Sequence, residues 1–473
     1  KQGAVDIHRG VSLHTNGFYG VLAFMTINAL LGNYDWAGGS IIGGTFSYDG
    51  SKGGPFNLAT HPGKLTPFGI SVIRHEVDYE KTTLFKGYPT PRNWYPLSSD
   101  IYEEIIPSIG DAYPYPAKAL FMLKAAPTYA LPAGQANIEI MTDLKKLPLI
   151  IFSDILIGTG SMYADYIFPD LSFLERWEFH GTHPNIAQRV QPVRQPAIAP
   201  IPETHRAFGQ QMPMSFESFF IAAAEKLGLP GFSKDAFGPG LDLNRPEDLY
   251  VRAVANLAAG EKPDYADAVP DADDREAQIF LRARRHLPKH SFDPDYWKAL
   301  LGGDDRLWRK TVYVLNRGGR FMDHDKTYKD GQLTVAHGGL ICLYQEKTAK
   351  CKYTGTGKPY PGYARFVPIE DYHGKPLDKL AAGYDLHLIT HRTILQCKTR
   401  TITNYWLLPM MPENFVSINP LDGKRLGLRD GQQVRVVSAT NPEGVWDLRN
   451  GTRKPMAGKL KLTETIKPGV VSF

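Results

Sequence analysis

From about Asp385 to its end, the chain consists of short apolar runs separated by turns, and this pattern restricts the fold more than any other feature. The runs cover residues 384–390, 414–420, 432–439, 458–466 and 468–473. Asp430-Gly431 supplies a typical turn just before the third run. Several short strands with regular turns are typical of a small β-barrel, which we expect over residues 381–473. Because the last run stops within an apolar stretch, we expect the barrel to be incomplete.

A different pattern precedes this region. Residues 148–156 form a continuous apolar run, as a strand buried on both faces does. A shorter apolar run at 118–124 and a helical segment at 137–147 come before it, and a loop at 154–165 follows. The order strand, helix, strand predicts a doubly wound α/β domain, in which ligands bind at the carboxyl ends of the strands.

The chain of 473 residues is long enough for two to four domains. We expect the end of a central α/β domain with a Gly-rich loop over 1–115, and a second α/β domain over 116–230. An inserted or peripheral layer is expected over 231–380, where alternating charges are typical of a solvated face. Apolar spacing predicts a helix at 17–31, ended by Gly32-Asn33. The first residue is not Met, so we expect the chain to begin within a longer protein, and the absence of a signal sequence is then uninformative.

Composition excludes several classes of function. Apolar residues at 42% and charged residues at 22% are ordinary for a globular protein, and a net charge of +5 without a dense basic block does not indicate nucleic acid as a partner. No run reaches the roughly 18 apolar residues of a membrane span. Cys342, Cys351 and Cys397 offer no zinc or iron–sulfur ligand set, and reduced thiols are favoured over a Cys342–Cys351 disulfide. The histidines form no spaced ligand set either, so no metal-ligating residue is predicted.

The most specific motif begins at the start of the terminal β region. A strand is followed by Thr-x-Arg, then Asn-x-Trp-Leu, a Pro-Glu turn, a strand ending in Asn-Pro and an Asp-Gly hairpin, in order over some fifty residues. Taken alone, the polar loop could belong to an ordinary β-barrel. The ordered motif resembles the dinucleotide-binding barrel of the DMSO reductase superfamily of molybdenum and tungsten enzymes. Threonine hydroxyls and an arginine fork suit pyrophosphate and pterin edges. The resemblance implies that these residues bind the cofactor: Thr390, His391, Arg392, Thr399, Arg400, Thr401 and Asn404.

A second motif lies in the expected α/β domain. The superfamily has a strand ending in Asp, a loop with Thr, and then an Asp-Tyr, Pro-Asp and Leu-Glu-Arg series. The resemblance implies that these residues also contact the dinucleotide: Asp154, Thr159, Asp165, Glu175 and Arg176. As a lone pattern, the loop could instead be a helix start capped by Ser161 or Asp165. The family's usual Asn-Pro upstream is replaced by Ala126-Pro127, which removes one expected amide contact.

A third motif, at residues 6–39, is similar to the superfamily segment that brings polar residues close to the metal. Its candidates for substrate contact and catalysis are Arg9, His14 and Asn16. Arginine and histidine there would bind an anionic oxo-substrate and supply protons. The alternative is a capping cluster, because Thr15-Asn16 directly precede the expected helix.

The resemblance extends over nearly the whole chain and is strongest to the tetrathionate reductase type. It implies an α/β fold followed by a C-terminal six-stranded barrel of the double-psi type, a bis(molybdopterin guanine dinucleotide) centre with Mo or W, and a [4Fe–4S] cluster in an N-terminal domain outside this sequence. It also implies two-electron oxo or sulfur-group chemistry on a sulfur oxyanion in anaerobic or sulfur respiration, and a periplasmic location or one on the cytoplasmic side. The implied partners are a ferredoxin-like iron–sulfur subunit and a quinone-linked membrane subunit.

Three alternatives stay open within this resemblance or beside it. One is another substrate of the same scaffold, with sulfite or sulfur oxidation, or with polysulfide, thiosulfate or arsenate reduction. Another is a metal-free structural subunit of a respiratory complex, which the departure at Ala126 favours and the intact motif from Thr390 to Gly431 opposes. An unrelated nucleotide-binding α/β protein would need a P-loop or a GxGxxG motif after its first strand, and the sequence has neither there.

Overall fold

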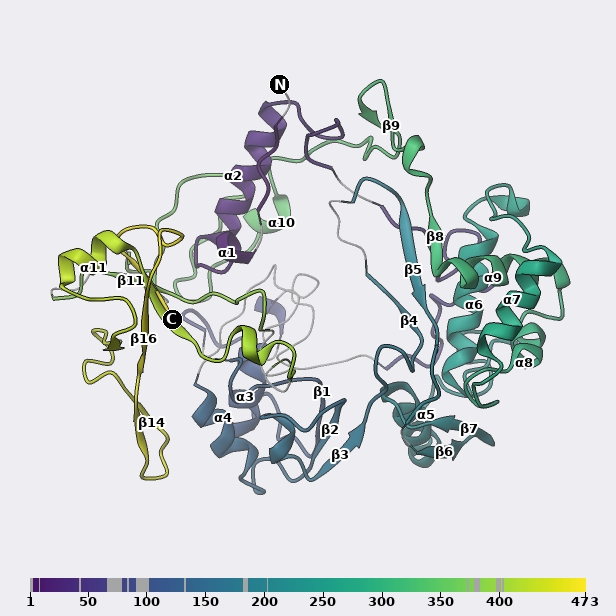
Figure 1. Ribbon diagram of the computed structural model, residues 1–473, viewed down its shortest axis with the longest axis horizontal. Helices are drawn as coiled ribbons and strands as arrows, with labels where there is room; N and C mark the ends of the chain where they lie inside the picture. Colours follow the sequence, from purple (N-terminus) through teal and green to yellow (C-terminus); the bar gives the residue numbers. More distant parts are fainter. Residues whose placement is uncertain are drawn as a thin grey trace.

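The structure is a computed structural model that describes residues 3–473 except 8, 42–43, 66–78, 83–84, 91–101, 132, 182–185, 202, 372–373, 378–382, 397–400 and 402–403. Figure 1 shows a parallel sheet with its helices at the bottom, a helical group at the right, and the C-terminal β region at the left. Helix α2 (Gly17–Leu30) lies at the top, near the amino terminus. It ends where the sequence predicted, because Gly32 takes the left-handed backbone conformation with φ +63°.

The α/β region is built on three parallel strands, β1 (Leu120–Leu123), β2 (Ile150–Asp154) and β3 (Tyr166–Pro169), which lie in the order β1-β2-β3. Helices α3 (Ile105–Gly110) and α4 (Gly134–Met141) cover one face. The core between them contains Ile106, Met122, Met141, Leu147, Ile150 and Phe152.

Helix α5 (Phe216–Leu227) covers the other face of this sheet. Its Phe219 stacks on Phe168 with ring centroids 4.6 Å apart and on Phe121 at 5.2 Å. Alternate residues of each strand therefore face opposite layers, which explains the continuous apolar run in the sequence. The α/β prediction is confirmed, with one difference. Strands β2 and β3 are joined through the single 3-10 turn η4 (Ser161–Tyr163) instead of an α-helix.

The loop after β1 leaves no room for a side chain at Gly134, the first residue of α4. A Cβ there would lie 1.9 Å from the carbonyl oxygen of Thr128. We expect Gly134→Ala to lower the free energy of unfolding by about 1–3 kcal/mol, because the loop must shift to admit a methyl group. Urea unfolding would measure the loss. Gly158→Ala is the matched control, because a Cβ at Gly158 meets nothing within 4 Å; equal losses in the two variants would contradict the steric explanation.

The helical group is formed by α6 (Pro246–Ala259), α7 (Asp274–Arg284), α8 (Pro294–Leu300) and α9 (Asp305–Arg317). Aspartate side chains cap three of these helices, since Asp273, Asp293 and Asp304 each accept a hydrogen bond from a backbone N–H of the first turn. Helix α6 lies in the interior, and its Val254 and Leu257 are fully buried with Trp297. Residues 231–380 thus contain a substantial core as well as charged outer faces.

Strand pairing joins the helical group to the rest of the chain. Strand β5 (Val190–Arg194) pairs with β8 (Gly319–Phe321), which follows α9, and with β4 (Glu178–Phe179). The remaining short elements are β6 (Thr204–Ala207), β7 (Gln210–Pro213), β9 (Tyr328–Lys329), β10 (Gln332–Leu333), α1 (Arg9–Ser12), α10 (Glu346–Ala349), η2 (Tyr79–Lys81), η3 (Tyr102–Glu104), η5 (Pro263–Tyr265), η6 (His324–Lys326) and η7 (Leu408–Met410). Among the described residues, no helix has the length and apolar character needed to cross a membrane.

The C-terminal region forms a mixed five-stranded sheet in the order β11-β17-β12-β16-β13. Its strands are β11 (His387–Ile389), β12 (Phe415–Ile418), β13 (Gln433–Arg435), β16 (Ala457–Leu462) and β17 (Val470–Ser472), and helix α11 (Pro420–Leu426) follows β12. The core of the sheet contains Val416, Ile418, Leu460 and Val471.

The prediction of six strands in a barrel is not confirmed, because the described residues give this sheet five. Two further strands, β14 (Val445–Asp447) and β15 (Arg453–Pro455), form a separate hairpin. The turn before it redirects the chain: the Asn441 side chain donates to the carbonyl of Val445 at 2.9 Å, and Gly444 has φ +56°. The domain boundaries at residues 115, 230 and 380 stay predictions.

Candidate functional site

The carboxyl ends of β1 and β2 carry two loops that pack against each other. Thr128, in the loop after β1, donates its hydroxyl to the carbonyl of Thr159, in the loop after β2, at 3.2 Å. Gly160 allows this close approach, since a Cβ there would lie 2.6 Å from the carbonyl oxygen of Ala125. The hydroxyl oxygen of Thr159 is buried and has no hydrogen-bond partner among the described residues. Thr159 therefore lies where the sequence predicted a ligand, at the carboxyl edge of the sheet.

Two predicted aspartates lie at opposite ends of β2. Asp154 is the last residue of the strand, and its Oδ1 accepts a hydrogen bond from the N–H of Ile155 at 2.8 Å. Asp165 accepts from the N–H of Ile150, the first residue of the strand, at 2.7 Å. The structure thus does not bring Asp165 to the edge where Asp154 and Thr159 lie. The carboxylate of Asp165 holds the start of the strand, and its role in cofactor binding stays a prediction.

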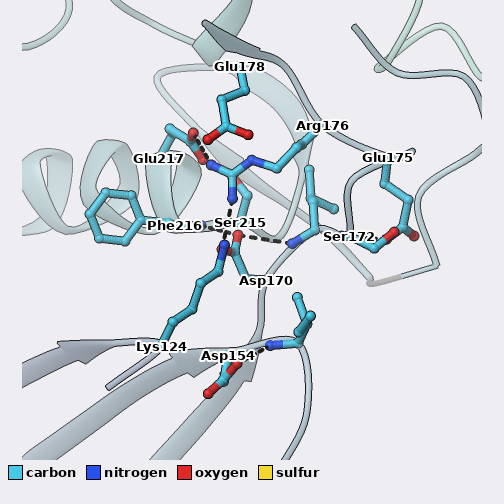
Figure 2. A network of polar contacts seen from close by, with 12 residues as sticks. Lys124, Asp154, Asp170, Ser172, Glu175, Arg176, Glu178, Ser215, Phe216 and Glu217 are labelled. Atoms are coloured by element: carbon cyan, nitrogen blue, oxygen red, sulfur yellow. Dashed lines mark hydrogen bonds and ion pairs between the residues drawn. The ribbon is translucent and has the colours of Figure 1, made fainter. Parts of the chain in front are cut away.

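Arg176 belongs to a buried network of charges (Figure 2). It lies between Asp170, at 3.0 Å, and Glu217, at 2.7 Å. Lys124 reaches Asp170 from the end of β1 at 3.3 Å, and the N–H of Phe216 donates to the same carboxylate. Burial favours a lower pKa for Arg176, but the carboxylates of Glu217 and Asp170 outweigh it and raise the pKa. The guanidinium of Arg176 is therefore engaged within the protein, and its role in cofactor binding stays a prediction.

Glu175 is also engaged by the protein itself. It is 4% exposed, and its two oxygens accept hydrogen bonds from the N–H groups of Ser172 at 2.8 Å and Ile201 at 2.6 Å. Burial alone would raise the pKa of Glu175, but the hydrogen bonds from Ile201 and Ser172 lower it overall. The carboxylate fixes the loop after β3, and a role for Glu175 in cofactor binding stays a prediction.

This lowered pKa predicts a pH dependence of stability. The stabilisation by Glu175 is fully present above the pKa of an unfolded glutamate, about 4.3, and is lost as the pH falls through the lower pKa of the folded state. We expect urea unfolding between pH 5 and pH 3 to show a shallower loss of stability for Glu175→Gln than for the unchanged protein. Identical pH profiles for the two proteins would contradict this role for Glu175.

The loop after β11 presents polar groups at the edge of the C-terminal sheet. Thr390, His391 and Arg392 are exposed, and Nδ1 of His391 forms a hydrogen bond with Oγ of Ser472 on β17. Arg392 forms no ion pair with any described residue. The hydroxyl oxygen of Thr393 is buried without a partner in the described part of the chain. The loop therefore offers hydrogen-bond donors at the end of a strand.

The other predicted residues of this loop differ in their surroundings. Thr399 and Arg400 lie outside the described residues. Thr401 donates its hydroxyl to Oε1 of Gln396 at 2.9 Å. The side-chain oxygen of Asn404 accepts from the N–H of Trp406 at 3.0 Å, so Asn404 caps the turn that follows it. The structure thus groups Thr390, His391 and Arg392 but gives Thr401 and Asn404 local contacts.

The amino-terminal candidates are not equivalent. Arg9 lies in α1, and its side chain is not described. His14 is exposed. The side-chain amide of Asn16 donates to the carbonyl of Val367 at 2.8 Å and does not cap α2. Thr15 forms hydrogen bonds with the backbone of Glu370, so the capping alternative is wrong, and these two residues hold the segment 367–370 instead.

Comparison with known proteins decides the family. Residues 386–473 match the family model described as "Molydopterin dinucleotide binding domain". The whole chain is 43% identical to a selenate reductase subunit of Mesobacillus selenatarsenatis and 30% identical to a tetrathionate reductase subunit of Salmonella typhimurium, and it covers 45% of each. The chain belongs to the molybdopterin oxidoreductase family, and it is similar to the C-terminal portion of the catalytic subunits.

A more distant relative by sequence agrees with this family. A tetrathionate reductase subunit of Archaeoglobus fulgidus is 28% identical over 98% of the chain and 41% of that protein. The chain thus spans less than half the length of these curated relatives. Among solved structures, acetylene hydratase from Pelobacter acetylenicus aligns with a TM-score of 0.39 at 15% identity, over 88% of this chain and 44% of that one.

The residues present fit the dinucleotide that defines this family. The hydroxyl oxygens of Thr159 and Thr393 are both buried without partners in the described part of the chain, and each lies in a loop that the family motifs identify. A buried hydroxyl without a hydrogen bond is costly, which indicates that a polar group completes it. Arg392 adds a cation beside Thr393 that pairs with no carboxylate among the described residues. These are the donors that a pyrophosphate group requires.

Direct metal ligation has no candidate in the described residues, which contain no cluster of three or more His, Cys, Asp or Glu suited to a metal ion. Cys342 and Cys351 form no disulfide with each other; Cys342 is exposed, and the thiol of Cys351 donates to the carbonyl of Lys347 at 2.9 Å. Cys397 lies outside the described residues. The prediction that this chain supplies no metal ligand stays a prediction.

The partners of Arg176 in the charge network were not predicted from the sequence. Lys124 directly follows β1 and has φ +49°, which is unusual for a lysine, and Asp170 directly follows β3. Their positions after apolar runs were a usable signal, because such positions lie at the carboxyl edge of a parallel sheet. Glu217 gave no such signal, since its contact with Arg176 depends on the tertiary fold.

Proposed function

We propose that this chain is part of the catalytic subunit of a molybdopterin-dependent reductase that acts on an oxyanion of sulfur or selenium. The observation that carries this proposal is the match of residues 386–473 to the dinucleotide-binding domain. Within this region, the loop after β11 contains Arg392 and Thr393, whose side-chain donors form no hydrogen bond with any described residue. The identity of the whole chain to selenate and tetrathionate reductase subunits supports the substrate class.

Residues of two loops would hold the cofactor. Arg392 would pair with phosphate oxygens, because a guanidinium binds them through two parallel hydrogen bonds. Thr390 and Thr393 would donate from the same loop. At the other loop, the hydroxyl of Thr159 would donate, and the carboxylate of Asp154 would accept from the edge of a guanine. When bound, a bis(molybdopterin guanine dinucleotide) centre with Mo or W supplies the exchange of two electrons and an oxo or sulfur group.

The amino-terminal segment would contact the substrate. Arg9 would attract the anion and His14 would hold or donate a proton, since an imidazole can do both. The amide of Asn16 already binds the carbonyl of Val367, so Asn16 would position the segment 367–370 beside them.

Electrons would come from outside this chain. We propose a [4Fe–4S] cluster in an N-terminal domain, a ferredoxin-like iron–sulfur subunit and a quinone-linked membrane subunit, with the enzyme in the periplasm. These assignments follow the chemistry, because a two-electron reduction of an external oxyanion requires a donor chain. Co-purification of the complete enzyme from its native membrane would test for such partners.

The substrate is tested by turnover of the complete enzyme with a reduced viologen dye as electron donor. We expect oxidation of the dye with tetrathionate or selenate, at a kcat/KM at least about tenfold above those for thiosulfate and arsenate, a ratio that one well-placed polar contact can give. Activity with arsenate alone, or only the oxidation of sulfite, would overturn the proposed substrate class.

A further inference from the structure

The β14–β15 hairpin leaves the C-terminal sheet and contacts the α/β region. The ring of Trp446 meets that of Tyr129 edge-on, with centroids 6.3 Å apart and planes at 89°. Nη1 of Arg449 lies 3.1 Å from Oε2 of Glu139 on α4. In Figure 1 the hairpin that carries β14 extends away from the sheet, toward the side on which α4 lies. Two contacts of different kinds therefore join the C-terminal region to the loop and helix that follow β1.

The hairpin is shaped to make these contacts. Arg449 lies at its tip with φ +56°, and its N–H donates to Oδ1 of Asp447 at 2.7 Å, which fixes the turn. At the base, the side chain of Asn441 donates to the carbonyl of Val445 at 2.9 Å and accepts from its N–H at 3.3 Å. Polar contacts at both ends therefore hold the hairpin in one conformation. A hairpin of fixed conformation can set the distance between the C-terminal sheet and the loop after β1.

The loop on the other side of the contact is equally constrained. Tyr129 is next to Thr128 in the sequence. The hydroxyl of Thr128 donates to the carbonyl of Thr159, and the carbonyl of Thr128 packs closely against Gly134. The side-chain amide of Asn137 donates to the carbonyl of Pro127 at 2.9 Å. A displacement of Tyr129 would therefore be transmitted through Thr128 to Thr159.

We expect these contacts to contribute little to the free energy of folding. Trp446 is 39% exposed, Tyr129 is 54% exposed, and both partners of the ion pair are about half exposed. Exposed ion pairs contribute little to stability because water and salt screen them. The two contacts can instead control where the C-terminal region lies relative to the α/β region.

We propose that Trp446 and Arg449 are positioning residues, which set the loop carrying Thr159 at a fixed spacing from the Thr390–Thr393 loop of the C-terminal region. This inference rests on the proposed function, in which the two loops share the binding of the cofactor. The pair Trp446–Tyr129 fixes the loop after β1, and the pair Arg449–Glu139 fixes the helix that follows it.

A charge swap in the complete enzyme tests this proposal. Arg449→Glu and Glu139→Arg each place like charges face to face, and the double swap restores an opposite pair. One readout is hydrogen–deuterium exchange of peptides covering residues 125–134, which needs no cofactor. The other is the molybdenum and pterin retained after gel filtration. We expect each single swap to speed exchange and to lower retention by about threefold, the size typical of an exposed pair, and the double swap to restore both.

Arg453→Glu is the matched control, because Arg453 pairs with Glu443 of the same hairpin region and not with α4. It should leave exchange at 125–134 and cofactor retention unchanged. Trp446→Ala should act like the single swaps. Unchanged exchange in both single swaps would overturn the proposal, as would changed exchange with full cofactor retention. If the protein without substitutions contained neither molybdenum nor pterin, the proposed function would be overturned. The hydrogen–deuterium exchange of residues 125–134 would then decide by itself whether the hairpin positions the loop after β1.

Discussion

Replacing Arg176 with alanine should lower the free energy of unfolding by about 3 kcal/mol, the lower end of the range for breaking a buried ion pair. The side chain of Asp170 is fully buried and that of Arg176 is 11% exposed, so the removal leaves a buried carboxylate with less compensation. Lys124 and two backbone N–H groups still contact Asp170, which places the expected loss at the lower end. Urea unfolding at neutral pH measures the change.

Lys298→Ala is the control for this prediction. Lys298 also forms an ion pair, with Asp305 at 2.8 Å, but both side chains are well exposed, and the effect should be much smaller. A loss for Arg176→Ala no larger than that for Lys298→Ala would show that the network does not stabilise the edge of the sheet.

Arg392→Ala should reduce cofactor retention by about tenfold or more, because charge-assisted hydrogen bonds to phosphate contribute about 1.5–3 kcal/mol. The guanidinium of Arg392 is exposed and has no ion-pair partner in the described part of the chain, so its removal should leave the fold intact. Molybdenum and pterin content per chain after dialysis measures the effect, with the unfolding midpoint as a check on folding.

Arg429→Ala is the matched control for Arg392, since Arg429 is an exposed arginine of the same C-terminal region outside the motif loop. It should retain the cofactor as the unchanged protein does. Equal losses in both variants would indicate a general charge effect, and no loss in either would remove Arg392 from the binding site.

Much of the fold was predictable where burial determines the sequence pattern. Ile150, Ile151 and Phe152 of β2 are all apolar because helices cover both faces of the sheet, and the apolar runs between turns located β12 and β16. The six-stranded barrel is not confirmed by the described residues, since apolar runs do not reveal which strands pair. The polar contacts of Asn441 turn β14 and β15 into a separate hairpin, and those contacts depend on local geometry.

The candidate site was predictable in its loops but not in its individual residues. The motif identified the loops of Thr159 and Arg392, because backbone position follows from the order of strands. The side chains of Glu175 and Arg176 turned out to be engaged by Ile201 and Glu217, which lie far away in the sequence. Asp165 lies at the opposite end of β2 from Asp154, because it directly precedes β3, a strand that was not predicted from the sequence.

The central claim is that this chain carries part of a molybdopterin dinucleotide site, and the most direct test is the cofactor content of the complete purified enzyme. Elemental analysis for Mo and W and fluorescence of the oxidised pterin should be made on the same sample. We predict one metal atom per catalytic chain with two pterin dinucleotides, which is the composition of a bis-dinucleotide centre. A folded protein with neither metal nor pterin would contradict the account and would favour a structural role for a chain that has kept the fold.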